Sequence, residues 1–101
     1  MQLADIKNIS VIGAGTMGRG IGLTYAWGGY QVVLHDTSDT ILNNAMSHVR
    51  DDLETVADGG LISPDGIGEI LSRITMTTDL KRAVKEADFV TEAVIENIKM
   101  V

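Results

Sequence analysis

The sequence has no cysteine, a single proline and four aromatic residues. Without cysteine the chain can form no disulfide, no thiolate metal site and no cysteine nucleophile. Basic residues are also few: 8 Lys and Arg stand against 14 Asp and Glu, for a net charge of −6 at pH 7. A nucleic-acid binder needs clustered Lys and Arg to neutralise phosphates, and no basic stripe interleaved with aromatics is present. We therefore predict no nucleic-acid partner.

Long apolar runs are missing as well. A helix that spans a bilayer needs about 20 mainly apolar residues, and the sequence has no such run. The opening MQLADIKN lacks the charged-then-apolar pattern of a secretory signal and carries an acid at Asp5. We expect a cytoplasmic protein with no membrane partner. The two histidines, His35 and His48, stand in unlike contexts, so we predict no metal site.

What the chain does contain is an alternation of strand-like and helix-like segments. We predict strands at 8–13, 31–36, 74–77 and 88–95, and helices at 16–27, 38–57, 64–73 and 79–87. Strands that alternate with helices form a parallel sheet with right-handed crossovers. The prediction is the first half of a Rossmann-type doubly wound α/β fold, with three layers and strand order 3-2-1-4.

Capping residues place several helix boundaries. Gly28 and Gly29 end the first helix, Ser38 is the N-cap of the second, Ser63 and Pro64 begin the third, and Asp79 caps the fourth. The long helix at 38–57 carries one apolar face at helical spacing. Its predicted members are Ile41, Ala45, Val49, Leu53 and Val56.

The most informative segment is the glycine-rich turn after the first strand. Its residues are Gly13, Ala14, Gly15, Thr16, Met17 and Gly18, which form the pattern G-x-G-x-x-G. This pattern alone is a weak signal. Here it follows a strand, opens a helix, and is followed 18 residues after its last glycine by Asp36, at the end of the second strand. Together these features indicate a dinucleotide-binding site.

Each glycine of this segment has its own physical reason. Gly13 permits the tight turn, Gly15 lets a pyrophosphate approach the backbone, and Gly18 lets the helix pack closely on the sheet. Gly20 and Gly22 lie inside the predicted helix, where a glycine costs about 1 kcal/mol relative to alanine. We expect Gly22 to extend the close packing and Gly20 to clear space for a neighbouring segment.

Asp36 is predicted to accept hydrogen bonds from the adenosine ribose hydroxyls. A 2′-phosphate would meet this carboxylate, and the next residues, Thr37 and Ser38, include no arginine to hold it, so NAD is preferred to NADP. The alternative is that Asp36 only caps the next helix. A P-loop is excluded because Gly18 is followed by Arg19 rather than by lysine. An FAD-binding or a methyltransferase domain stays open.

Three segments, VIGAGTMGRGI, VVLHD and DFVTEAVIENIK, resemble the N-terminal NAD-binding domain of the L-3-hydroxyacyl-CoA dehydrogenase family. This family includes 3-hydroxybutyryl-CoA dehydrogenases, multifunctional fatty-oxidation proteins and L-gulonate 3-dehydrogenase. The resemblance covers nearly the whole chain. It implies oxidation of a 3-hydroxyacyl-CoA to a 3-ketoacyl-CoA in fatty acid metabolism, with hydride transfer to NAD.

The resemblance also assigns residues. It carries over the residues at 13–18 and Asp36 as cofactor ligands, and it matches Glu96 to a family acid near the nicotinamide-side ribose. The alternative for Glu96 is a solvated acid at a helix start. Glu92 lies within an apolar strand, and we expect it to be a buried hydrogen-bonding residue.

Several positions depart from the family pattern. The family often has a lysine where this chain has Val101, and a serine and a lysine that contact coenzyme A where this chain has Asp52 and Gly59. A small hydroxy acid such as gulonate therefore stays open as the substrate. A stand-alone nucleotide-binding module without catalysis is a further alternative.

The catalytic His–Glu pair of the family lies beyond the fourth strand, and the chain has no counterpart of it. His35 is expected at the surface of a strand end and His48 in solvent. We expect residues 1–101 to be the NAD-binding portion of a longer dehydrogenase, inactive alone, without the C-terminal helical domain that helps bind acyl-CoA. The edge of the fourth strand should then be covered by another chain, as in a homo-oligomer.

Overall fold

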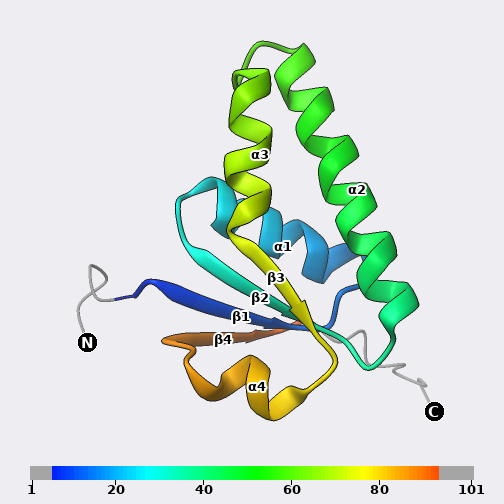
Figure 1. Cartoon of the computed structure of the whole chain (residues 1–101), viewed down its shortest axis with the longest axis vertical. Helices are drawn as coiled ribbons and strands as arrows, with labels where there is room; N and C mark the ends of the chain where they lie inside the picture. The colour runs from blue at the N-terminus through cyan, green and yellow to red at the C-terminus, as the bar shows by residue number, and fades with distance from the viewer. Residues whose placement is uncertain (1–5, 94–101) are drawn as a thin grey trace, which may run out of the picture.

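The computed structural model describes residues 6–93, and it shows a four-stranded sheet with helices on both faces (Figure 1). Its elements are β1 (Asn8–Ile12), α1 (Thr16–Trp27), β2 (Gln31–His35), α2 (Asp39–Asp58), α3 (Pro64–Ser72), β3 (Ile74–Thr77), α4 (Leu80–Lys85) and β4 (Phe89–Glu92). All strands are parallel and their order is β3-β2-β1-β4. The predicted element order, strand order and fold class are confirmed.

The predicted capping residues hold most helix starts in place. The hydroxyl of Ser38 accepts a hydrogen bond from the Ile41 N–H at 3.3 Å, and Ser63 caps α3 in the same way. Asp79 accepts from the first N–H groups of α4. Because each cap satisfies N–H groups that have no partner inside the helix, these helices begin where the sequence predicts.

Other boundaries differ slightly from prediction. β1 ends one residue early because Gly13, with φ at +104°, has already left the extended conformation. β2 also ends one residue early, at His35. α4 ends at Lys85 rather than at 87, and β4 begins at Phe89. Residues 94 and 95 of the predicted fourth strand lie outside the described part of the chain.

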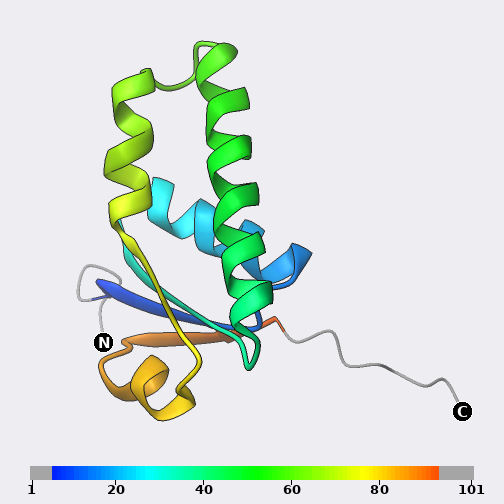
Figure 2. The same ribbon diagram turned by 45° about the vertical axis from the view of Figure 1, so that its right-hand side comes forward.

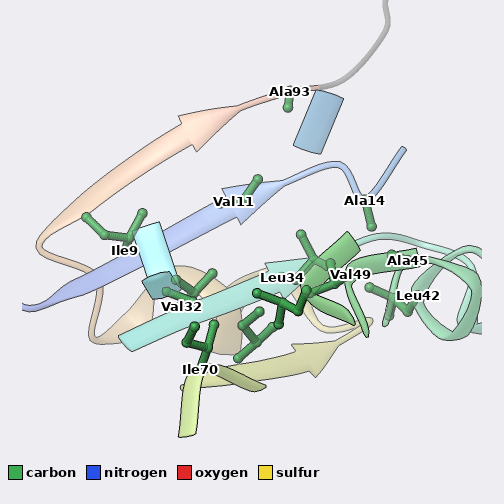
Figure 3. Packing of buried hydrophobic residues seen from close by; sticks show 13 residues of the cluster. Ile9, Val11, Ala14, Val32, Leu34, Leu42, Ala45, Val49, Ile70 and Ala93 are labelled. Atoms are coloured by element: carbon green, nitrogen blue, oxygen red, sulfur yellow. The ribbon is translucent and has the colours of Figure 1, made fainter. Parts of the chain in front are cut away.

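The core lies between the sheet and α1, α2 and α3, which all lie on one face (Figures 1 and 2). Ile9 and Val11 of β1 and Val32 and Leu34 of β2 point into it (Figure 3). In register, Ile9 pairs with Val32 and Val11 with Leu34, so these side chains share one face. They form the buried floor on which α1 packs.

The apolar face of α2 is rotated from its predicted position. Ala45, Val49 and Leu53 are buried as expected, but Leu42 is 2% exposed and Ile41 is 41% exposed. Each step of four residues turns a helix about 40° past a full turn. Leu53, Val49, Ala45 and Ile41 are spaced four residues apart, so each lies about 40° further round the helix than the one before. By Ile41 this rotation has reached the edge of the buried face.

Among the helices of residues 6–93, α4 alone lies on the opposite face of the sheet (Figure 2). Here Ser10 is buried and its hydroxyl donates to the carbonyl of Ala83, which ties α4 to β1. β4 is an edge strand of the described sheet and pairs with β1 alone; Phe89 and Val90 are 46% and 42% exposed. Among residues 6–93, no helix combines the length and the apolar character needed to cross a membrane.

Candidate cofactor site

The glycine turn joins the carboxyl end of β1 to the start of α1. The Gly13 N–H donates to the His35 carbonyl at 2.7 Å, which fixes the turn beside the end of β2. Its φ of +104° lies in the left-handed region, which side chains other than glycine rarely adopt. The turn at the end of β1 therefore requires glycine at position 13, as the sequence predicts.

Gly18 is enclosed by the protein itself. A Cβ added there would lie 1.7 Å from the Gly13 carbonyl oxygen and 3.4 Å from the Ala93 Cβ. No side chain fits at that separation. The first turn of α1 thus lies directly against the backbone of the preceding turn, which is the close packing that the sequence predicts for this glycine.

The other two helical glycines differ from each other. A Cβ at Gly22 would lie 3.6 Å from Val32 Cγ1, an ordinary contact, so this position extends the close face of α1. At Gly20 nothing described lies within 4 Å, and the residue is exposed. The expectation that Gly20 clears space for a neighbouring segment is therefore wrong for the part of the chain that the structure describes.

Gly15 faces open space at the start of α1. Apart from its two chain neighbours, no heavy atom of residues 6–93 lies within 4 Å of a Cβ built there, and the helix has no side-chain cap at this residue. The first N–H groups of a helix have no partner within the helix. Those of Thr16, Met17 and Gly18 therefore have no partner within α1, and they lie at the positive end of the helix dipole. Such an arrangement suits an anion, and the pyrophosphate of NAD fits it.

Asp36 binds this turn directly. Its Oδ2 accepts a hydrogen bond from the Ala14 N–H at 3.0 Å, and its Oδ1 accepts one from the Ser38 N–H at 3.2 Å. The N-cap of α2 is Ser38, so the alternative that Asp36 only caps this helix is wrong. Each carboxylate oxygen can accept more than one hydrogen bond, which leaves capacity for ribose hydroxyls. The bond to Ala14 was not predicted, because sequence spacing does not report contacts between loops.

Two further predictions need correction. His35 is buried, with 5% exposed, because the segment after β3 covers it; its Nε2 lies 3.2 Å from the Thr78 carbonyl oxygen. Glu92 is exposed at the end of β4 rather than buried, because in the described sheet β4 has a neighbouring strand on one side only. His48 faces solvent as predicted. Glu96 lies outside the described residues.

The site thus combines a turn with the left-handed Gly13, an open helix start, and the Asp36 carboxylate that follows β2 and binds the turn. The family model described as "3-hydroxyacyl-CoA dehydrogenase, NAD binding domain" matches residues 8–100. The chain belongs to this family. The predicted family and the predicted cofactor, NAD, are confirmed.

Individual relatives show the same likeness. Hydroxyacyl-coenzyme A dehydrogenase, mitochondrial, of Sus scrofa is 33% identical over 94% of this chain and 32% of its own length. The 5-formyl-3-hydroxy-2-methylpyridine 4-carboxylate 5-dehydrogenase of Mesorhizobium japonicum is 40% identical over 94% of this chain and 30% of its own length. The crystal structure of (S)-3-hydroxybutyryl-CoA dehydrogenase from Ralstonia eutropha superposes with a TM-score of 0.87. It is 31% identical, and the match covers 92% of this chain and 32% of that protein. The chain spans about a third of the length of these proteins.

Proposed function

We propose that the chain is the cofactor-binding portion of an NAD-dependent 3-hydroxyacyl-CoA dehydrogenase of fatty acid metabolism, and that it acts in the cytoplasm. NAD, when bound, accepts a hydride from the carbon that bears the substrate hydroxyl. Residues of this chain bind and orient the cofactor. The base that removes the hydroxyl proton belongs to the remaining part of such an enzyme, so this chain alone should be inactive.

The roles of individual residues follow from the geometry of the turn. We assign the pyrophosphate to the open space at Gly15, within reach of the N–H groups of Thr16, Met17 and Gly18. Gly13 and Ala14 form the turn that leads into this helix start. By resemblance, we assign Glu96 to the nicotinamide-side ribose.

Asp36 is the adenosine-side ligand in this proposal. Its hydrogen bond to Ala14 fixes the carboxylate beside the glycine turn, where ribose hydroxyls can donate to it. A 2′-phosphate at the same place would be repelled by the carboxylate, so NAD should bind better than NADP. This fixed carboxylate beside an open helix start is the observation that carries the proposal.

A second candidate substrate class has its own support. The relative from Mesorhizobium japonicum, 40% identical to this chain, is named for a pyridine carboxylate rather than for an acyl-CoA. Asp52 and Gly59 also stand where family members have a serine and a lysine that contact coenzyme A. A hydroxy acid, such as one of the gulonate type, is the alternative substrate, and the cofactor role is the same in both cases.

The assembly is part of the proposal as well. β4 leaves one edge of the described sheet without a partner strand and exposes Phe89 and Val90. Such an edge pairs readily with another strand. We therefore propose that this edge is covered in the working enzyme, and that the enzyme is a homo-oligomer. Analytical ultracentrifugation of the chain at increasing concentration tests self-association at this edge.

Calorimetric titration tests the cofactor role. Wild-type chain should bind NAD measurably and NADP more weakly. Asp36→Ala should weaken NAD binding about tenfold or more, since a hydrogen bond to a charged group contributes about 1.5–3 kcal/mol. Asp36→Asn keeps an acceptor for the Ala14 N–H but loses the charge, so it should narrow the preference for NAD over NADP while the turn stays intact.

The fluorescence of Trp27, the single tryptophan, reports whether each variant is folded. Equal binding of NAD and NADP by the wild type, unchanged in both variants, would contradict the assignment of Asp36. Binding of FAD or S-adenosylmethionine in place of NAD would contradict the cofactor site itself.

A further inference from the structure

Arg19 occupies a particular place beside the open space at Gly15. Gly15 is the N-cap of α1 and Arg19 lies four residues further along the chain, where its N–H donates to the Gly15 carbonyl at 2.9 Å. Residues at this spacing lie on the same helix face, and side chains on a helix lean toward its N-terminus. Arg19 is half-buried and lies one helical turn after Gly15, so its side chain leans toward the open space at Gly15.

The charge of Arg19 has no counterpart in the described structure. The first turn of α1 contains no acidic residue, and the ion pair found within residues 6–93 joins Arg73 to Glu69. The N-terminus of a helix carries a partial positive charge, so a cation near it is unfavourable. Neither an ion pair nor the helix dipole accounts for a cation here, whereas a bound anion would.

We propose that Arg19 binds the pyrophosphate of the dinucleotide directly, and that it adds a charged donor to the N–H groups of the first turn. The inference rests on the proposed NAD-binding role of the turn. A guanidinium presents planar paired donors that match phosphate oxygens and keeps its charge at all working pH values. Arg19 thus supplies the cation that the G-x-G-x-x-G turn itself lacks.

Three variants and three ligands test this assignment. Arg19→Gln should weaken binding of NAD and of ADP-ribose, which keeps the pyrophosphate, about three- to tenfold at low salt. Adenosine has no phosphate, and its binding, followed by NMR, should not change. Arg19→Lys should restore part of the affinity. Arg50→Gln removes a cation from an exposed site in α2 and should leave all three affinities as in the wild type.

Salt and stability separate a ligand role from a structural one. The decrease in NAD affinity with rising salt should be shallower in Arg19→Gln, because one charge contact is lost. The urea midpoint of the ligand-free variant, followed by Trp27 fluorescence, should equal or exceed that of the wild type, since a cation is removed from the positive helix end.

A lowered midpoint together with an equal loss of adenosine binding would show that Arg19 is structural and would overturn the assignment. Equal NAD affinity in wild type and Arg19→Gln would overturn it as well, while leaving the proposed function in place. A wild-type chain that binds neither NAD nor ADP-ribose would reject the proposed function, and the assignment with it.

Discussion

One aspartate accepts backbone hydrogen bonds near each end of strand β1, but the two aspartates hold different structures. At the amino end, Asp88 accepts the N–H groups of Lys7 and Asn8 at 2.9 and 3.0 Å on a single oxygen. At the carboxyl end, Asp36 accepts the N–H groups of Ala14 and Ser38, one on each oxygen. The first aspartate closes the strand onto its neighbour β4. The second holds the glycine turn, beside which the chain leaves space unfilled.

This difference separates glycines that the fold requires from those that it does not. At Gly18 the protein itself excludes a side chain, and at Gly13 the backbone conformation does. At Gly15 neither reason applies: its φ is −70°, and in the described part of the chain no residue beyond its two neighbours comes within 4 Å of a Cβ built there. A glycine without a structural reason, at the carboxyl end of a parallel sheet, is best explained by the close approach of a ligand.

The largest effect on stability should come from Gly18→Ala. The added Cβ would meet the Gly13 carbonyl oxygen, and α1 would have to move away from the turn. Overpacking of this kind costs about 1–3 kcal/mol, and a backbone neighbour, which cannot rotate aside, should place the cost at the upper end. Urea unfolding followed by Trp27 fluorescence measures it. Gly22→Ala is the matched control, since its Cβ would make an ordinary contact; equal losses would contradict the distinction.

Gly20→Ala should act in the opposite direction. The position is exposed, helical and open, so alanine should stabilise the chain by about 0.5–1 kcal/mol through reduced backbone entropy of the unfolded state. The same urea experiment detects this as a raised midpoint. A lowered midpoint would mean that another part of the molecule occupies this space after all.

The smallest effect should be the pH dependence contributed by Asp88. Hydrogen bonds from the backbone N–H of Lys7, and then of Asn8, lower the pKa of this carboxyl below its ordinary value of 3.8. A lowered folded-state pKa gives stability that is present above pH 3.8 and is lost as the pH falls through the lower value. Asp88→Asn should therefore be less stable than wild type at neutral pH.

The difference in urea midpoint between wild type and Asp88→Asn should become smaller as the pH falls below 3.8. Urea midpoints measured between neutral pH and the acid limit of folding test this. Asp52→Asn removes a charge from an exposed site in α2 and is the control. A difference that stays constant with pH would show that the charge at the amino end of β1 contributes nothing to stability.

Much of the fold could be predicted from local signals. The caps at Ser38, Ser63 and Asp79 and the breaks at Gly28 and Gly29 depend on short-range chemistry, and the structure confirms each. The strand order follows from general rules for parallel sheets and is confirmed too. The requirement for glycine at 13 and 18 could also be predicted, because the turn pattern fixes both.

What could not be predicted depends on contacts between segments distant in sequence. The burial of His35 results from the chain after β3, more than forty positions later. The rotation of α2 that buries Leu42 instead of Ile41 is decided by packing, because helical periodicity allows both. The hydrogen bond from Ala14 to Asp36 links two loops, and only the folded chain shows that the predicted ribose ligand also holds the glycine turn.

Gly15→Ala gives the most direct test of the central claim, that this turn leaves room for a pyrophosphate rather than for the protein. Its urea midpoint and its affinity for NAD should be measured on the same preparation. We predict a midpoint equal to or above wild type, because the backbone is extended and the space is open, and NAD binding weakened at least about tenfold. Unchanged NAD affinity in a stably folded variant would contradict the claim.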